Sequence, residues 1–268
     1  MITRAIDFHT HAFPDDLADE AIESLEQGEA KAHLDGTIDD LLDSMDRAGI
    51  ERSVICCVAT RPDQFPNIMD WCREIQSVRL IPFPSVHPDD PQALERVRQV
   101  AEEGFRGMKL HAYYQDFTVD DEDLFPLYEE LQKQDLVLVA HAGFDFAFEK
   151  DRRAEPQRIA EVARHFPDLR LVASHLGGWK DWDEVERHIL GTDIYMETSF
   201  GAELLGLART RDILMNHPAD HLLFGTDSPW TDQVRAVELI ESMNLPSERE
   251  RMLLRRNAIR LLRLEDTT

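Results

Sequence analysis

Two histidines stand two residues apart near the start of the chain, in the stretch AIDFHTH at residues 5–11. In a β-strand, residues i and i+2 point to the same face, so His9 and His11 would project side by side. Neutral imidazole is a common protein ligand for zinc and related metals. The spacing therefore suggests a metal site, and the alternative is an exposed histidine pair at the end of a strand.

Other apolar stretches also end in residues that could do chemistry. Five of the chain's 11 histidines lie at such ends. A catalytic metal needs three or four protein ligands and an open position for water, whose pKa it lowers towards neutrality. Each residue alone has an ordinary explanation as a buried core histidine, a helix cap or a turn residue. The residues concerned are Lys109 and His111, His141, His175 and Asp227, which end the stretches 105–111, 136–141, 170–175 and 221–227.

Eight short apolar runs alternate with longer amphipathic stretches, as expected for an α/β protein. Buried parallel strands read as such continuous apolar runs. The alternation predicts a single (β/α)8 barrel (TIM barrel), in which catalytic groups lie at the carboxyl ends of the strands. An open doubly wound sheet is the rival, but no glycine-rich phosphate turn follows the first run. The predicted strands lie within 5–11, 53–58, 79–86, 105–111, 136–141, 170–175, 193–198 and 221–227.

Several signals mark where the intervening helices begin and end. Thr37 opens the stretch TIDDLLDSMDRAGI and Gly49 closes it, while Pro126 limits another helix to a start near Leu124. We predict one domain over residues 1–268, with a C-terminal helix at about 247–264 that opens with a capping box of Ser247 and Glu250. We expect this last helix to close the bottom of the barrel, with a homodimer contact as the alternative use.

The totals exclude several classes of protein. The chain has 268 residues, 43% of them hydrophobic, which is enough for one large domain. No apolar run approaches the roughly 18 residues of a membrane span, and the first residues lack a secretory signal pattern. The net charge of −24 argues against a nucleic-acid partner, because phosphate binding needs basic residues. Three cysteines without C-x-x-C spacing argue against a disulfide scaffold, so a cytoplasmic protein is expected.

Five motifs in order resemble the amidohydrolase superfamily, and the resemblance extends from the first histidine to Trp230. They are HTH at 9–11, GMKLH at 107–111, VLVAHAG at 137–143, LVASHLGG at 171–178 and LLFGTDSPW at 222–230. The stretch at 35–55, DGTIDDLLDSMDRAGIERSVI, also resembles the branch that includes aminocarboxymuconate-semialdehyde decarboxylase and γ-resorcylate decarboxylase.

The resemblance implies a role for each residue of the site. His9 and His11 would bind a divalent metal from the first strand, and His141 would be the third histidine ligand. Asp227 would be a ligand and, in hydrolytic members, the base that takes a proton from the metal-bound water. His175 would orient that water or polarise the substrate. Zinc is the expected ion, and manganese or iron would fit the same nitrogen and oxygen ligands.

Lys109 decides between one ion and two. Several two-metal amidohydrolases carry a carbamylated lysine on the fourth strand that bridges the ions, and His141 and His175 would then both bind the second ion. An unmodified Lys109 is a cation that can hold a substrate carboxylate. We expect one ion and an unmodified lysine, because GMKLH is closer to the one-metal branch.

Further residues are candidates for the pocket wall. His111 lies on the same strand face as Lys109, and Trp179 and Trp230 follow the sixth and eighth strands, where they could bind a planar substrate. The alternatives are a rim histidine and ordinary loop packing. Arg152 and Arg153, in the long loop after the fifth strand, could bind an anionic substrate or could simply be solvated.

The leading hypothesis is a metal-dependent hydrolase that attacks an amide, lactone or ester carbonyl of a small molecule. The second is a decarboxylase of an aromatic or enol-like acid, and a carboxylate-bearing substrate would suit Lys109 in either case. The chain is shorter than many decarboxylases of the branch, which favours hydrolysis. A non-catalytic barrel that serves as a binding protein is the third hypothesis. His217 and the other histidines of helices and loops are expected at the surface.

Overall fold

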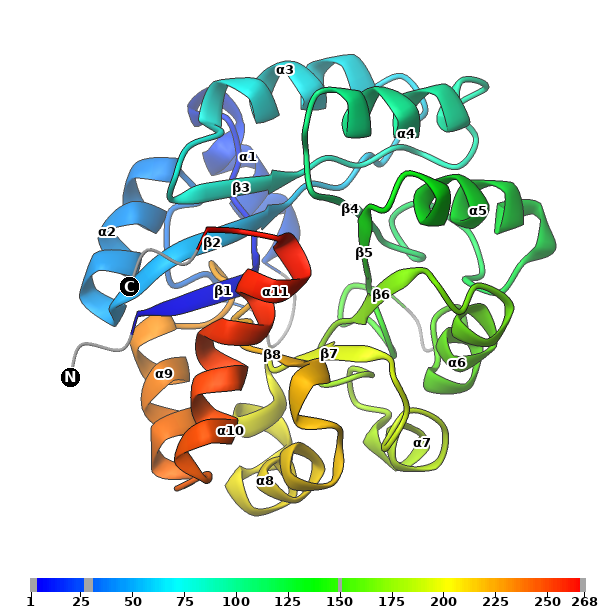
Figure 1. Ribbon diagram of the computed structural model, residues 1–268. Helices are drawn as coiled ribbons and strands as arrows, with labels where there is room; N and C mark the ends of the chain where they lie inside the picture. Colours follow the sequence, from blue (N-terminus) through cyan, green and yellow to red (C-terminus); the bar gives the residue numbers. More distant parts are fainter. Residues whose placement is uncertain (1–3, 27–30, 149–150, 266–268) are drawn as a thin grey trace.

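The computed structural model describes residues 4–26, 31–148 and 151–265 (Figure 1). In these ranges eight strands alternate with helices, as predicted. The strands are β1 (Ala5–Thr10), β2 (Ile50–Cys56), β3 (Leu80–Phe83), β4 (Gly107–Leu110), β5 (Val137–Ala140), β6 (Arg170–Ala173), β7 (Tyr195–Glu197) and β8 (Leu222–Leu223). The helices are α1 (Asp15–Leu25), α2 (Ile38–Ala48), α3 (Phe65–Ile75), α4 (Ala93–Glu102), α5 (Phe125–Lys133), α6 (Pro156–His165), α7 (Trp182–His188), α8 (Leu207–Asn216), α9 (Gln233–Ser242), α10 (Ser247–Arg251) and α11 (Asn257–Leu262).

Local sequence signals explain several helix ends. The Thr37 hydroxyl oxygen accepts a hydrogen bond from the backbone N–H of Asp40, and Gly49, with a φ of 70°, ends α2 in the left-handed conformation. Helix α5 begins at Phe125, which agrees with the start predicted from the proline that follows. The capping box predicted at Ser247 is wrong, because this residue is already helical and no side chain caps α10.

All paired strands are parallel, and they form two ladders, β1–β2–β3 and β4 to β8. Backbone hydrogen bonds join the two ladders on both sides. The Lys109 N–H donates to the Pro84 carbonyl at 3.0 Å, beside β3 and β4. On the other side, the Phe8 N–H donates to the Phe224 carbonyl and the Asp227 N–H to the His9 carbonyl, each at 2.7 Å. The strands therefore make the predicted (β/α)8 barrel, not an open doubly wound sheet.

The apolar core has two layers. The larger layer lies between the strands and the surrounding helices, and the smaller one fills the barrel. Residues of α11 join the inner layer, so this helix plugs one end of the barrel, as Figure 1 shows in red. Arg170, at the start of β6, donates to the carbonyl of Leu261 at 2.6 Å, which places the plug at the amino ends of the strands. The inner layer comprises Ile6, Phe8, Val54, Cys56, Ile81, Phe83, Val137, Val139, Val172, Leu223, Ala258, Leu261 and Leu262.

Two helices were not predicted from the sequence, α1 and α3. In α1 the apolar residues Leu17, Ala18, Ala21, Ile22 and Leu25 do have helical spacing, but only Ala18 is buried. The predicted last helix is continuous in sequence but consists of α10, a π-helical turn (Met252–Arg256) and α11. None of the helices in the described ranges has both the length and the apolar character to cross a bilayer.

Candidate metal centre

A cavity of about 710 Å³ lies at the carboxyl ends of the strands. Parallel strands of a barrel bring these ends together, so residues far apart in the sequence can meet there. Nine of the residues that the sequence suggested line the cavity: His9, His11, Lys109, His111, His141, His175, Trp179, Asp227 and Trp230. The structure therefore brings these residues to one place, and their individual contacts indicate what they can do.

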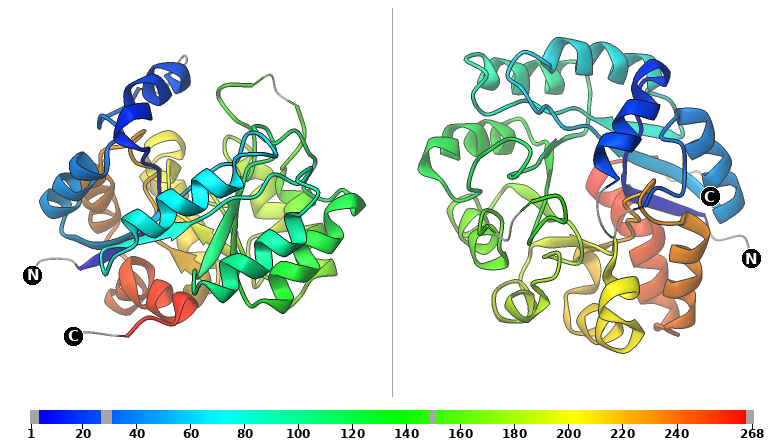
Figure 2. Two further views of the ribbon diagram at one scale, coloured as in Figure 1. Left: turned by 90° about the horizontal axis from the view of Figure 1, so that it is seen from above. Right: turned by 180° about the vertical axis from the view of Figure 1, so that it is seen from behind.

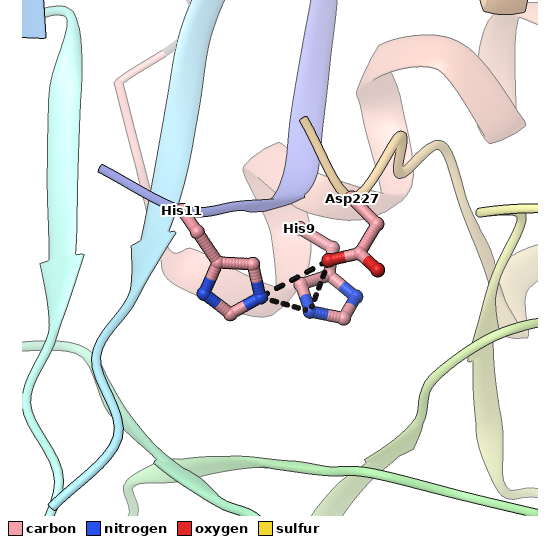
Figure 3. A group of neighbouring side chains, drawn as sticks. All are labelled: His9, His11 and Asp227. Atoms are coloured by element: carbon pink, nitrogen blue, oxygen red, sulfur yellow. Dashed lines mark hydrogen bonds and ion pairs between the residues drawn. The ribbon is translucent and has the colours of Figure 1, made fainter. Parts of the chain in front are cut away.

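Three of them form a compact group, which Figure 3 shows. The Nε2 atoms of His9 and His11 lie 3.2 Å apart. Asp227 Oδ1 lies 3.4 Å from Nε2 of His9 and 3.0 Å from Nε2 of His11. The two histidines come from the end of β1, and Asp227 lies in the segment after β8 that is hydrogen bonded to β1.

Hydrogen bonds define which nitrogen of each ring carries the proton. His9 Nδ1 donates to Glu197 Oε1 at 2.9 Å, and His11 Nδ1 donates to the Cys56 carbonyl at 2.7 Å. Both Nε2 atoms are then unprotonated in neutral rings, and they face Asp227 Oδ1, which accepts no hydrogen bond within the described ranges. Three lone pairs this close repel one another unless a cation lies among them. The donor set therefore fits a divalent metal ion.

Glu197 orients this group, a role that was not predicted from the sequence. Its Oε1 accepts hydrogen bonds from His9 Nδ1, from the backbone N–H of His175 at 2.7 Å and from the Ser199 hydroxyl at 2.8 Å. Its Oε2 accepts the backbone N–H of Ser199 at 2.7 Å. Gly225 makes room for the carboxylate, because a Cβ there would overlap Oε2. Glu197 ends β7, so the rule that found the other residues at strand ends would also have found it.

His141 and His175 form a second pair. His175 Nδ1 donates to the Ser199 hydroxyl oxygen, and His141 Nε2 donates to the Phe144 carbonyl, both at 2.8 Å. The two remaining nitrogens, His175 Nε2 and His141 Nδ1, face each other at 3.0 Å. The structure thus places His141 against His175 and outside the group of three.

Lys109 is fully buried beside the first group. Its Nζ lies 3.2 Å from Nε2 of His9. No ion pair within the described ranges involves this lysine. A buried ammonium without a carboxylate partner is unusual, because burying an unpaired charge is costly.

His111 and His141 lie close to Asp145, which was not predicted from the sequence as a site residue. Asp145 Oδ2 lies 3.4 Å from His111 Nε2 and 3.9 Å from His141 Nε2. The two imidazole rings stack with their centroids 4.1 Å apart. Asp145 lies in the irregular segment after β5, where neither periodicity nor a strand end marks it in the sequence.

Burial controls the protonation of these groups. It lowers the pKa of His9, His111, His141 and His175 well below the ordinary value, and the charge of Lys109 acts in the same direction. The four rings are therefore neutral near pH 7, the form in which imidazole binds metals. Burial also raises the pKa of Glu197 from 4.5 to about 7, against the hydrogen bonds that it accepts.

The backbone is strained at two of these residues. His175 has a φ of 57° and Asp227 a φ of 61°, both in the left-handed region that residues other than glycine seldom adopt. Such conformations cost about 1–3 kcal/mol each and cluster at functional sites. The strain aims both side chains from the strand ends into the cavity.

The arginines of the long loop do not reach the cavity. Arg153 forms ion pairs with Asp116 and Asp151, and Arg152 lies 3.7 Å from Asp181. Neither arginine lines the cavity, so the suggestion that they bind an anion there is wrong.

His217 is buried, and the expectation that it lies at the surface is wrong. Only 1% of it is exposed. Its Nε2 donates to the Ile194 carbonyl at 2.8 Å, and its Nδ1 accepts the N–H of Gly191 at 3.3 Å. The ring therefore has a structural role as a neutral histidine.

The sequence matches the amidohydrolase family over residues 6–264. Dihydroorotase of Helicobacter pylori (strain HPAG1) is 28% identical over 133 residues, which are 46% of this chain and 39% of the relative. The match thus spans less than half of that curated relative.

Three solved structures share the fold over nearly their whole length. The complex of 2,6-dihydroxybenzoate decarboxylase with 2,6-dihydroxybenzoate has a TM-score of 0.75 at 17% identity, over 97% of this chain and 99% of that chain. The 5-carboxyvanillate decarboxylase of Novosphingobium aromaticivorans DSM 12444, complexed with manganese and a nitrobenzoic acid, has a TM-score of 0.69 at 14% identity, over 97% and 96%. The putative 2-pyrone-4,6-dicarboxylic acid hydrolase of Pseudomonas putida has a TM-score of 0.68 at 20% identity, over 97% of each chain. With its barrel, its histidines and aspartate at the strand ends and this match, the chain belongs to the amidohydrolase family of metal-dependent enzymes.

Proposed function

We propose that this chain is a metal-dependent enzyme that removes carbon dioxide from a small aromatic or enol-like acid. The observation that carries the proposal is the buried ammonium of Lys109, 3.2 Å from His9 Nε2 and without an ion-pair partner in the described ranges. A substrate carboxylate would supply the missing counter-charge. The two decarboxylases of similar fold, which act on aromatic acids or bind them, support this substrate class.

His9, His11 and Asp227 would hold the ion, and His141 is the further ligand that the family resemblance implies. When bound, a divalent ion polarises the substrate oxygens and stabilises the negative charge that develops as carbon dioxide leaves. Zinc is the ion that we expect from the nitrogen and oxygen donors, and manganese is the alternative suggested by the decarboxylase of similar fold that holds it.

Other side chains of the site would bind the substrate and transfer protons. Lys109 binds the carboxylate as a point charge, while Trp179 and Trp230 form apolar walls for a planar ring. His175, held through Nδ1 by Ser199, presents an unprotonated Nε2 to the site, which can take a proton from the substrate and return it to the carbon that loses the carboxylate.

Hydrolysis of an amide, lactone or ester is the second candidate, and one observation favours it. Asp227 Oδ1 is buried and accepts no hydrogen bond within the described ranges, so it can take a proton from an attacking water. The dihydroorotase and the putative pyrone hydrolase named above are consistent with this reaction.

A second ion is the alternative for the metal content. A carbamylated Lys109 would add an oxygen ligand, and the facing nitrogens of His141 and His175, 3.0 Å apart, would bind the second ion.

The test is to offer aromatic acids, lactones and esters to metal-loaded protein, and to measure carbon dioxide and released acid separately. We expect carbon dioxide from an aromatic acid, with loss of activity on chelation and in Asp227→Asn. Acid release from a lactone or ester without carbon dioxide would instead establish hydrolysis. Turnover that persists unchanged after complete metal removal would contradict both reactions.

A further inference from the structure

We propose that the substrate carries an uncharged apolar extension, an alkyl chain or a second ring, that lies between α1 and α3. This inference rests on the proposed function, because the metal end of the cavity would bind the polar end of the same molecule. It adds a substrate class to that function.

Two helical faces build the outer part of the cavity. From α1, the lining residues are spaced as i, i+3, i+4, i+7 and i+8, which is one continuous face of a helix. They are Leu17, Glu20, Ala21, Ser24 and Leu25. From α3 and the residue before it, the lining residues are spaced as i, i+3, i+4 and i+7. They are Gln64, Asn67, Ile68 and Trp71. Each helix therefore turns a whole face towards the cavity.

The α1 face has little other use in the fold. Only Ala18 of this helix is buried, and Leu17 is 50% exposed, which makes it one of few large apolar side chains at the surface of the described chain. The left view of Figure 2 shows α1 at the end of the barrel opposite the C-terminal helices, and residues of both α1 and α3 line the cavity. An apolar group between the two helices would bury this face.

The cavity is larger than a single ring requires. A protein cavity of about 150 Å³ is enough to bind benzene, and this one has about 710 Å³. One ring at the histidines would therefore leave most of the volume, including the α1 and α3 faces, unfilled.

The charges of the outer part indicate an uncharged extension. Among the described residues that line the cavity, Arg61 is the one lysine or arginine besides Lys109, and its Nε lies 3.3 Å from Asp63 Oδ1. Glu20, on α1, would repel a second carboxylate. A monoacid with an apolar tail fits this distribution better than a diacid.

The experiment measures binding and does not depend on turnover. Straight-chain carboxylates from acetate to decanoate are titrated into metal-loaded protein by calorimetry. We expect the affinity to rise about fourfold for each added methylene once the chain reaches the helices. Ala21→Trp should stop this rise at shorter chains, and Leu17→Ser should reduce it, without changing the affinity for acetate. Leu94→Ser is the matched control, since Leu94 is an exposed leucine outside the cavity, and it should behave as the unaltered protein does.

Three results would overturn the proposal. They are an affinity independent of chain length, a rise that both Leu17→Ser and Ala21→Trp leave unchanged, and a dimer that Leu17→Ser dissociates, which would mean that a second copy covers α1. Repeating the acetate titration after chelation tests the proposed function separately. One outcome is that the affinity for acetate is the same with and without metal, while Ala21→Trp still stops the increase in affinity at shorter chains. That result would support the apolar extension and contradict the proposed metal site.

Discussion

Replacing Glu197 by glutamine should weaken metal binding about 10- to 100-fold, although residue 197 is not itself expected to be a ligand. Three donors approach Oε1 and the Ser199 N–H approaches Oε2. If the amide oxygen of the glutamine takes the place of Oε1, it keeps three of these hydrogen bonds. The amide NH2 then takes the place of Oε2 and faces the Ser199 N–H, so that this N–H loses its acceptor. A buried donor that loses its acceptor costs about 1–3 kcal/mol. Outer partners of metal ligands are worth about 10- to 100-fold in affinity, or about 1.4–2.7 kcal/mol, so the two magnitudes agree.

The assay is competition for zinc or manganese against a chromophoric chelator, together with urea unfolding of the metal-free proteins. Glu130→Gln is the matched control. Glu130 is also a buried glutamate, but it accepts hydrogen bonds from Arg98 and Gln134 and does not line the cavity. We expect the control to lower the free energy of unfolding and to leave the metal affinity unchanged. Equal metal affinities for Glu197→Gln and the unaltered protein would refute the role of Glu197, and an equal loss of affinity in the control would refute its specificity.

Three further predictions concern residues that support the fold or the site without lining the cavity. Burial lowers the pKa of His217 from 6.5 to about 4, so the unfolded chain binds more protons between these values. The free energy of unfolding should therefore decrease by about 3 kcal/mol as the pH falls through this range. Urea unfolding of His217→Gln should show a flatter pH profile, and parallel profiles would contradict the assignment. Leu261→Ala should lower the free energy of unfolding by about 2–5 kcal/mol, because it empties part of the plug inside the barrel; a loss below about 1 kcal/mol in denaturant titration would mean that the plug is not tightly packed. Gly225→Ala should weaken metal binding in the chelator assay, because its Cβ would displace the Glu197 carboxylate, and unchanged affinity would show that the carboxylate can move without cost.

The sequence was informative where a residue's position follows from repetition. Each strand of a barrel buries both faces, so eight apolar runs could be recognised without knowing their neighbours. The ends of those runs then located His9, His11, His141, His175 and Asp227, because parallel strands bring their carboxyl ends together.

The sequence was not informative where position depends on tertiary contacts. Asp145 and the α1 face lie in connections between strands, whose paths follow from packing and not from a periodic pattern. The apolar residues of α1 have helical spacing, but the sequence does not show that Leu17, Ala21 and Leu25 turn to the cavity and not to the core. The prediction that His217 lies at the surface was wrong for the same reason. Its hydrogen-bond partners, Gly191 and Ile194, belong to another connection between strands.

The metal content per chain tests the central claim most directly. Protein loaded with zinc or manganese and then desalted would be analysed by plasma mass spectrometry, as the unaltered chain and as His11→Ala and Asp227→Ala. We predict about one ion per chain for the unaltered protein and a loss of that ion in both variants, because His9, His11 and Asp227 direct three lone pairs at one point. Two ions would point instead to a carbamylated Lys109 with His141 and His175 as further ligands. No bound ion, or an ion retained by both variants, would contradict the account.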